Sequence, residues 1–332
     1  MRQANLATRV LRLLLVLTAT GCASGNEAHD GGANDADSGS VPPVPMLDRS
    51  VPADGWRWES SLGVEVAVPA DWKINDTDCN QTDAPSVVRS QGTVLSCLTA
   101  EPPTKQIIEI ADERTAKSVG RPDFLTYTNV MVGSVAAERG EGETADGRAA
   151  GWLHLPSIHV IVDVRVKGKE TLQRVLDSVR VIDTDHNLCA TARKDMGPVA
   201  PRQSTLAPSH VSTISVCYFD KANVLQASAL IEGDEAQQVA DELNATKPGR
   251  NIDVPESTCL HESEQPPPDA VLLVLGDADH AQIEMTFSSC THRGLSNGRA
   301  ETQLTRPLLE AIMKPVATGY GFSPYGLTSF HE

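Results

Sequence analysis

Apolar and polar residues alternate along several stretches in the first half of the chain, and this period of two predicts β-strands. Apolar residues and their polar neighbours alternate most regularly in Ser157–Lys167. A sheet with one buried and one wetter face follows from such a pattern. Further strands are expected at Gly63–Pro69, Thr93–Thr99, Gln106–Ile110, Thr126–Ala136 and Val179–Ile182.

Apolar residues at helical spacing predict three helices. The first covers Lys169–Asp177, and the second begins with a capping box at Asp234–Gln237. The third begins at Thr305, with a proline in its first turn, where proline is tolerated. The side chains expected to face the core are Leu172, Val175, Leu176 and Val179, then Ala236, Val239, Ala240 and Leu243, then Leu308, Leu309, Ile312 and Met313.

These elements predict an α+β protein with two folded bodies. Residues 50–182 are expected to form an antiparallel sheet with a late helix. Residues 183–315 are expected to form a duplicated strand–strand–helix domain, with halves at about 189–248 and 259–315. The repeat is indicated by apolar strands at Val211–Val216 and Ile283–Ser289, and by a Lys-Pro step after each helix.

The N-terminus has a basic start and a short apolar run, Leu13–Ala19, which is typical of an export signal and too short to span a membrane. Thr18–Cys22 resembles the lipobox of bacterial lipoproteins, in which a signal peptidase cuts before a diacylated cysteine. It departs from that pattern at Ala19, where leucine is usual. We therefore expect residues 1–21 to be a signal peptide and Cys22 to carry diacylglycerol and palmitate; the alternative is an ordinary cleaved signal that leaves a free thiol.

Residues 22–49 are acidic and poor in apolar side chains, which predicts a disordered tether between the lipid and the folded bodies. The Gly- and aromatic-rich residues 316–332 are expected to form a tail. A formal net charge of −16 argues against nucleic-acid binding, since it repels phosphate backbones.

The six cysteines after Cys22 are an even number, which in an exported chain predicts disulfides. Each bond is expected to close a loop inside one structural unit. A metal site would need close-spaced pairs such as C-x-x-C, so neither a metal nor another cofactor is expected. The expected pairs are Cys79–Cys97, Cys189–Cys217 and Cys259–Cys290.

The runs Trp58–Trp72 and Leu176–Cys189, together with the repeated cysteine units, resemble exported lipoproteins of actinobacteria. The resemblance covers most of residues 50–315 and implies an exported, lipid-anchored protein. It implies no activity, because that family has none assigned.

Four patterns could carry chemistry, and each has a plainer interpretation. Gly294–Gly298 matches the G-x-S-x-G turn of hydrolases, but the helix starts too late and Asn-Gly is itself a turn signal. Asp183–Asn187 begins like a calcium loop but lacks its later ligands. His154 and His159 could share a metal, but no third ligand is visible nearby. All four tryptophans lie in the first body, where core packing is favoured over sugar stacking.

No catalytic residues are therefore assigned. We expect a non-enzymatic binding or interaction module of the envelope, held by its lipid at the outer face of the cytoplasmic membrane. Its partner would be an envelope protein or a glycan. The alternative is a secreted hydrolase of envelope polymers whose residues meet only in the folded chain.

Overall fold

The strands form three sheets in the computed structural model, which describes residues 52–76, 82–89, 104–114, 120–199, 204–253, 270–276, 281–287 and 291–316. The first sheet is antiparallel and has the order β1-β2-β10. Strand β2 lies where the sequence predicts a strand, and five of its six residues are buried. The strands of this first sheet are β1 (Trp56–Ser61), β2 (Val64–Pro69) and β10 (Arg180–Val181).

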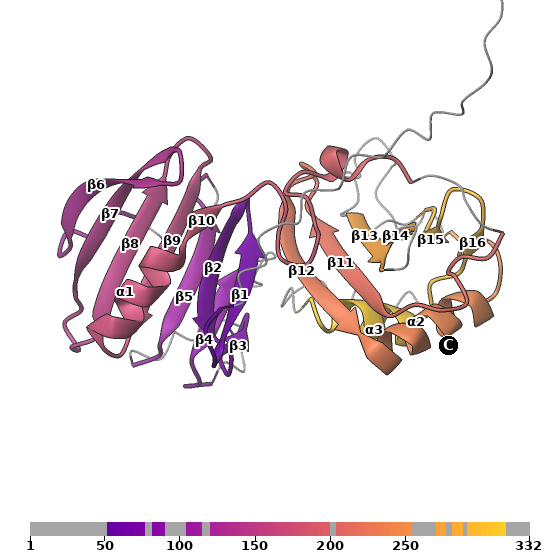
Figure 1. The fold of residues 1–332 in the computed structure, drawn as a ribbon, viewed down its shortest axis with the longest axis horizontal. Coiled ribbons are helices and arrows are strands. Elements are labelled where there is room, and N and C mark those ends of the chain that lie inside the picture. Colours follow the sequence, from indigo (N-terminus) through magenta and orange to yellow (C-terminus); the bar gives the residue numbers. More distant parts are fainter. Residues whose placement is uncertain are drawn as a thin grey trace, which may run out of the picture. The chain divides into compact units, whose positions relative to one another are not determined.

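The second sheet has seven strands in the order β3-β4-β5-β9-β8-β7-β6 (Figure 1). It is mixed rather than wholly antiparallel as predicted, because β4 pairs in parallel with both β3 and β5. Long connections before and after β4 allow the crossovers that parallel pairing requires. Its strands are β3 (Lys73–Ile74), β4 (Ser86–Arg89), β5 (Ile107–Asp112), β6 (Thr126–Val132), β7 (Val135–Glu143), β8 (Ala149–Leu155) and β9 (Val160–Val166).

The single strand expected over Thr126–Ala136 is instead the start of a hairpin. Strands β6 and β7 are joined at Gly133, whose φ of 60° lies in the left-handed region that glycine adopts readily. The strand expected over Ser157–Lys167 begins later, at Val160, because the residues before it form the turn from β8. Residues Thr93–Thr99 lie outside the described part of the chain.

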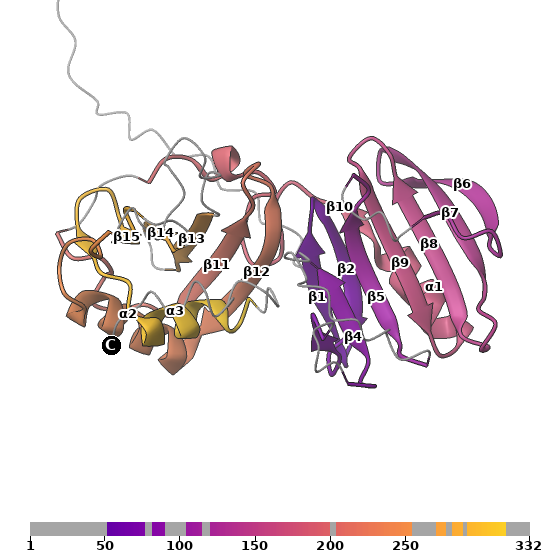
Figure 2. The ribbon, with the colours of Figure 1, turned by 180° about the vertical axis from the view of Figure 1, so that it is seen from behind.

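Helix α1 (Lys169–Ser178) covers one face of the seven-stranded sheet, as the sequence predicts. It lies in front of β8 and β9 in Figure 1 and behind them in Figure 2. Leu172, Val175 and Leu176 are buried against the valines of β9 and of β2. The alternating valines and the helical stripe thus meet in one core.

A fully buried lysine fixes the β3–β4 edge of this sheet. The Lys105 ammonium donates hydrogen bonds to the Asp76 carboxylate at 2.8 Å and to the Thr82 carbonyl at 3.0 Å, and also to the Asp76 carbonyl. Burial raises the pKa of Asp76, but hydrogen bonds from Lys105 and Thr82 outweigh this and lower it. The Lys105 ammonium tolerates burial because each of its three protons has a hydrogen-bond acceptor.

The third sheet has six strands in the order β12-β11-β13-β14-β15-β16, with all neighbouring pairs antiparallel. Helices α2 (Gly233–Ala245) and α3 (Arg306–Met313) pack together on one face of it (Figures 1 and 2). Every inward residue predicted for these two helices is buried. The strands are β11 (Thr213–Phe219), β12 (Leu225–Glu232), β13 (Ala270–Leu275), β14 (Gln282–Thr286), β15 (Gly294–Ser296) and β16 (Glu301–Thr302).

The capping box predicted for the second helix is wrong. Helix α2 begins at Gly233, and no side chain caps it. Gln237 instead accepts a hydrogen bond from the Val211 N–H at 3.0 Å and donates one to Asp241 at 2.8 Å. The Gln237 side chain therefore bonds these groups and does not cap the start of the helix. The third helix starts as predicted, and Thr305 caps it by accepting from the Leu308 N–H at 3.4 Å.

The opposite face of the six-stranded sheet carries the Cys189–Cys217 disulfide in a small apolar cluster. This cluster contains Phe219, Leu225 and Leu272. A short 3₁₀ helix (Arg193–Met196) follows Cys189 in the chain, and its Met196 packs against the cluster. The sheet is therefore covered on both faces, by two helices on one side and by the disulfide layer on the other. Within the described residues, no helix has the length and apolar character needed to cross a membrane.

Candidate functional site

Five of the predicted site residues lie outside the described part of the chain, and two lie inside it. The two inside form the predicted disulfide, with Cα atoms 5.5 Å apart. The bond links the chain before the 3₁₀ helix to the middle of β11, so it fixes one face of the six-stranded sheet. The five outside are Cys22, Cys79, Cys97, Cys259 and Cys290.

The structure adds an acidic residue to the histidine pair His154 and His159. The Glu113 carboxylate oxygen Oε2 lies 3.1 Å from Nε2 of His154 and 3.4 Å from Nδ1 of His159. The nearby His154 imidazole lowers the pKa of Glu113. Sequence reasoning missed Glu113 because it is brought there only by the pairing of β5 with β9. Across the described ranges, no group of three or more ligating side chains is arranged to hold a metal ion.

The segment Asp183–Asn187 is a turn built around the buried Asp185 and not a calcium loop. Asp185 is 1 % exposed, and its Oδ1 accepts hydrogen bonds from the N–H groups of Asn187 and Cys189 at 2.9 and 2.8 Å. Its other oxygen accepts from the Ser228 hydroxyl. Burial raises the pKa of Asp185. Both of its carboxylate oxygens accept hydrogen bonds from groups of the fold.

Ser60, Glu65 and His186 form a cluster with the three residue types of a hydrolase triad. The Ser60 hydroxyl donates to Glu65 Oε1 at 2.8 Å, and His186 Nδ1 lies 2.6 Å from the same oxygen. In a triad the acid bonds one imidazole nitrogen and the serine bonds the other. Here Ser60 Oγ also contacts Nδ1, at 3.3 Å, so the histidine cannot relay a proton between them.

This cluster is instead a buried ion-pair network. Glu65 is fully buried and is also paired with Arg180. Burial raises the pKa of Glu65, but hydrogen bonds from His186, Ser60 and Arg180 outweigh it and lower that pKa to about 2. The carboxylate therefore stays ionised and holds three segments together.

Ser296 does not lie on a nucleophile elbow. It ends β15, and the chain turns through Gly298, at a φ of 82°, into β16 rather than into a helix. Helix α3 starts only at Arg306. The Asn-Gly turn indicated by the sequence is therefore the correct interpretation of this motif.

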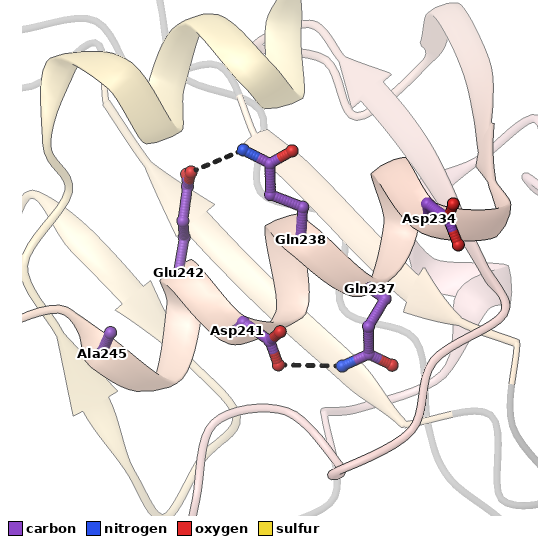
Figure 3. Close-up of a pocket in the computed structure, with 6 residues that line it drawn as sticks. All are labelled: Asp234, Gln237, Gln238, Asp241, Glu242 and Ala245. Atoms are coloured by element: carbon purple, nitrogen blue, oxygen red, sulfur yellow. Dashed lines mark hydrogen bonds between the residues drawn. The ribbon is translucent and has the colours of Figure 1, made fainter.

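The exposed side of α2 carries a hollow of about 390 Å³ lined by acidic and amide side chains (Figure 3). Gln237 donates to Asp241 at 2.8 Å and Gln238 donates to Glu242 at 3.3 Å. Figure 3 shows these as two separate pairs, each carboxylate turned toward its own amide, so the carboxylates do not converge on a common centre. This surface is a solvated helix face with internal hydrogen bonds.

A larger hollow of about 530 Å³ lies between three segments of the six-stranded-sheet body, and we call it the clamp pocket. Its walls are the loop 204–206, the end of α2 with the residues after it (243–249), and the β15–β16 turn (296–302). Its volume is in the usual range for small-molecule sites, about 300–1,000 Å³.

Two asparagines hold the walls of the clamp pocket through contacts that the sequence did not predict. Asn244 of α2 pairs with the backbone of Ala207, accepting from its N–H and donating to its carbonyl, both at 3.0 Å. Asn297 donates to the carbonyls of Thr205 and Leu206 at 2.8 and 3.3 Å. The same loop is thus tied to α2 and to the β15–β16 turn.

The third wall is tied by backbone pairing after α2. The Lys247 carbonyl accepts from the Thr302 hydroxyl at 2.9 Å and from the Gln303 N–H at 3.0 Å. The Gly249 N–H donates to the Glu301 carbonyl at 2.9 Å. All three walls are therefore joined, and the pocket exists before any ligand binds.

Within the described residues, the rim of the clamp pocket carries one cation without an ion-pair partner, Arg299. Glu301 is held by the Arg250 guanidinium through contacts of 2.8 and 2.9 Å, and this hydrogen bonding lowers the pKa of Glu301. The exposed guanidinium of Arg299 makes no ion pair with any described residue. The pocket thus presents the positively charged Arg299 guanidinium, although the whole chain has a net charge of −16.

These features rest on the residues of this chain alone, because comparisons with protein-family models, with curated proteins and with solved structures found no match.

Proposed function

We propose that the protein is a lipid-anchored module at the outer face of the cytoplasmic membrane that binds a small polar component of the envelope without transforming it. The anchor is inferred from the export signal and from Cys22 in its lipobox-like setting. The binding role is carried by one observation, the clamp pocket, whose walls are joined by hydrogen bonds in the free protein. A preformed pocket spends little free energy on ordering when its ligand binds.

Membrane fractionation of cells that express the full chain tests the anchor. The unaltered protein is expected in the membrane fraction, and the Cys22→Ala variant is expected in the medium or the soluble exported fraction. An exported Cys22→Ala protein that stays in the membrane fraction would show that the lipid is not the anchor.

Co-sedimentation of the purified full chain with isolated cell envelopes tests the binding role. We expect saturable binding to the envelopes and no release of soluble fragments from them. Release of fragments would instead support the alternative, a secreted hydrolase of envelope polymers. Binding that does not saturate, or no binding at all, would contradict the proposal.

We also infer that the six-stranded-sheet body arose by duplication of a strand–strand–helix unit. The antiparallel pair β11–β12 precedes α2, the antiparallel pair β14–β15 precedes α3, and both helices share one core. Peptide mapping of the oxidised protein tests the repeat, because it requires a Cys259–Cys290 bond matching Cys189–Cys217. A bond from Cys259 or Cys290 to Cys79 or Cys97 would contradict it.

A further inference from the structure

We propose that the ligand of the clamp pocket is an acidic sugar, that is, a hydroxylated ring bearing one carboxylate or phosphate, and that Arg299 pairs with its anionic group. This inference deepens the proposed binding function and rests on it. Arg299 suits the anionic group of such a ligand, and the hydroxyl and apolar groups of the pocket walls suit its sugar ring.

The position of Arg299 suits it to bind an anion. Its backbone is fixed in the β15–β16 turn, because its N–H donates to the Asn297 side-chain oxygen at 3.0 Å. Its side chain starts from this fixed point at the rim, and none of the described carboxylates pairs with it. Because a guanidinium can bond both oxygens of a carboxylate or phosphate at once, it selects such groups over neutral ones.

The other charges at the rim do not oppose this. Glu301 is the only acidic residue among those lining the pocket in the described structure, and it is already bonded twice by Arg250. A positively charged ligand would have to compete with Arg250 for that carboxylate. An anionic ligand meets Arg299 without displacing any contact.

The hydroxyl groups in the walls suit a polyhydroxylated ring. The Ser296 oxygen accepts from the Gly298 N–H at 3.1 Å, so its own proton remains to donate. The Thr246 hydroxyl donates to the Glu242 carbonyl at 2.7 Å, so its oxygen remains to accept. A sugar hydroxyl both donates and accepts, and the pocket offers a partner for each role.

The same pocket has apolar wall at Leu206, Leu243 and Pro248. Leu206 and Leu243 are only 5 % and 1 % exposed, so each presents a small apolar surface to the pocket, and together they do not form a large hydrophobic surface. Such surfaces match the C–H faces of a sugar ring better than a large hydrophobic ligand, which would leave the surrounding hydroxyls unpaired.

Titration of the full chain in detergent micelles tests this inference, with glucuronate, glucose 6-phosphate and glucose as probes and calorimetry as the readout. At least one acidic sugar is expected to bind with a dissociation constant of about 1 mM or tighter. Glucose is expected to bind at least about tenfold more weakly, since it lacks the charge-assisted pair. A preference for glucuronate would identify a carboxylate ligand, and a preference for glucose 6-phosphate would identify a phosphate ligand.

The Arg299→Ala variant is expected to lose about tenfold or more in affinity for the acidic sugar and little for glucose. Arg299→Lys should recover only part of the loss, because an ammonium does not bond two oxygens in a fixed fork. Arg306→Ala is the matched control: it removes a cation that pairs with Glu310 on α3, away from the pocket, and should leave the affinity unchanged. Equal chemical-denaturation midpoints of the variants would show that they are folded.

Equal binding of glucose and glucuronate, or a folded Arg299→Ala variant with unchanged affinity, would overturn the inference. So would the absence of binding by all three probes. In that last case saturable envelope binding would still uphold the proposed function, so the two failures are distinguishable.

Discussion

Replacement of Glu65 by glutamine tests whether the buried ion-pair network stabilises the fold. The pKa of Glu65 is lowered from 4.5 to about 2 in the folded chain, and each pKa unit corresponds to about 1.4 kcal/mol. The carboxylate should therefore contribute about 3 kcal/mol near neutral pH. Glutamine keeps the shape and can still accept from the Ser60 hydroxyl, so the variant removes mainly the charge.

The pH dependence has a definite sign. Because the folded pKa is lowered, the contribution is fully present above pH 4.5 and is lost as pH falls through about 2. Guanidinium chloride unfolding at several pH values should show Glu65→Gln less stable by about 3 kcal/mol at pH 7 and nearly equal to the unaltered protein at pH 2.

Glu310→Gln is the matched control, because it removes an exposed partner of Arg306 and should cost under about 0.5 kcal/mol. The reasoning is refuted if Glu65→Gln costs no more than this control at pH 7. It is also refuted if the difference between the unaltered protein and Glu65→Gln does not change between pH 7 and pH 2.

Three further changes follow from the structure. Lys105→Met should cost about 3–5 kcal/mol in chemical unfolding, because it leaves a carboxylate and two carbonyls without their donor; a cost equal to that of the exposed Lys221→Met would contradict this. Asp185→Asn should match or exceed the stability of the unaltered protein at pH 7, because the raised folded pKa of Asp185 means that stability is lost as pH rises through it; a large loss at pH 7 would argue against this. Replacing Cys189 and Cys217 together by alanine should cost about 3–4 kcal/mol for a sequence separation of 28, measured by thermal or chemical unfolding; an unchanged midpoint would show that the bond does not stabilise the fold.

Periodicity predicted the elements that pack on one face. The valines of β9 and the inward stripes of α1, α2 and α3 are buried as expected, because each element has one apolar face and one core to cover. The same reasoning did not show that Glu65, a charged residue of β2, is fully buried. Side-chain alternation gives the two faces of a strand but not whether a second layer covers the polar one.

Long-range pairing decides most of what the sequence did not show. Glu113 joins the two histidines only because β5 pairs with β9, and the parallel β3–β4–β5 edge depends on where long connections return. The capping box failed because Gln237 found a partner in the chain before β11. A local motif predicts a local bond only when no distant group competes for it.

The clamp pocket was not predicted, although one signal was present. Asn297-Gly298 was interpreted as a turn, and the structure confirms the turn. The sequence does not show that Asn297 also bonds a loop about 90 residues earlier, at separations of 92 and 91 residues. Asn244 is likewise an ordinary exposed helix residue until the loop reaches it.

The account depends most on the lipid anchor, and mass spectrometry of the N-terminal peptide from the native protein tests it directly. The protein purified from membranes should give a peptide that begins at Cys22 and carries a diacylglyceryl group on the thiol. A peptide that begins at Met1, or one that begins at Cys22 with an unmodified thiol, would contradict the account.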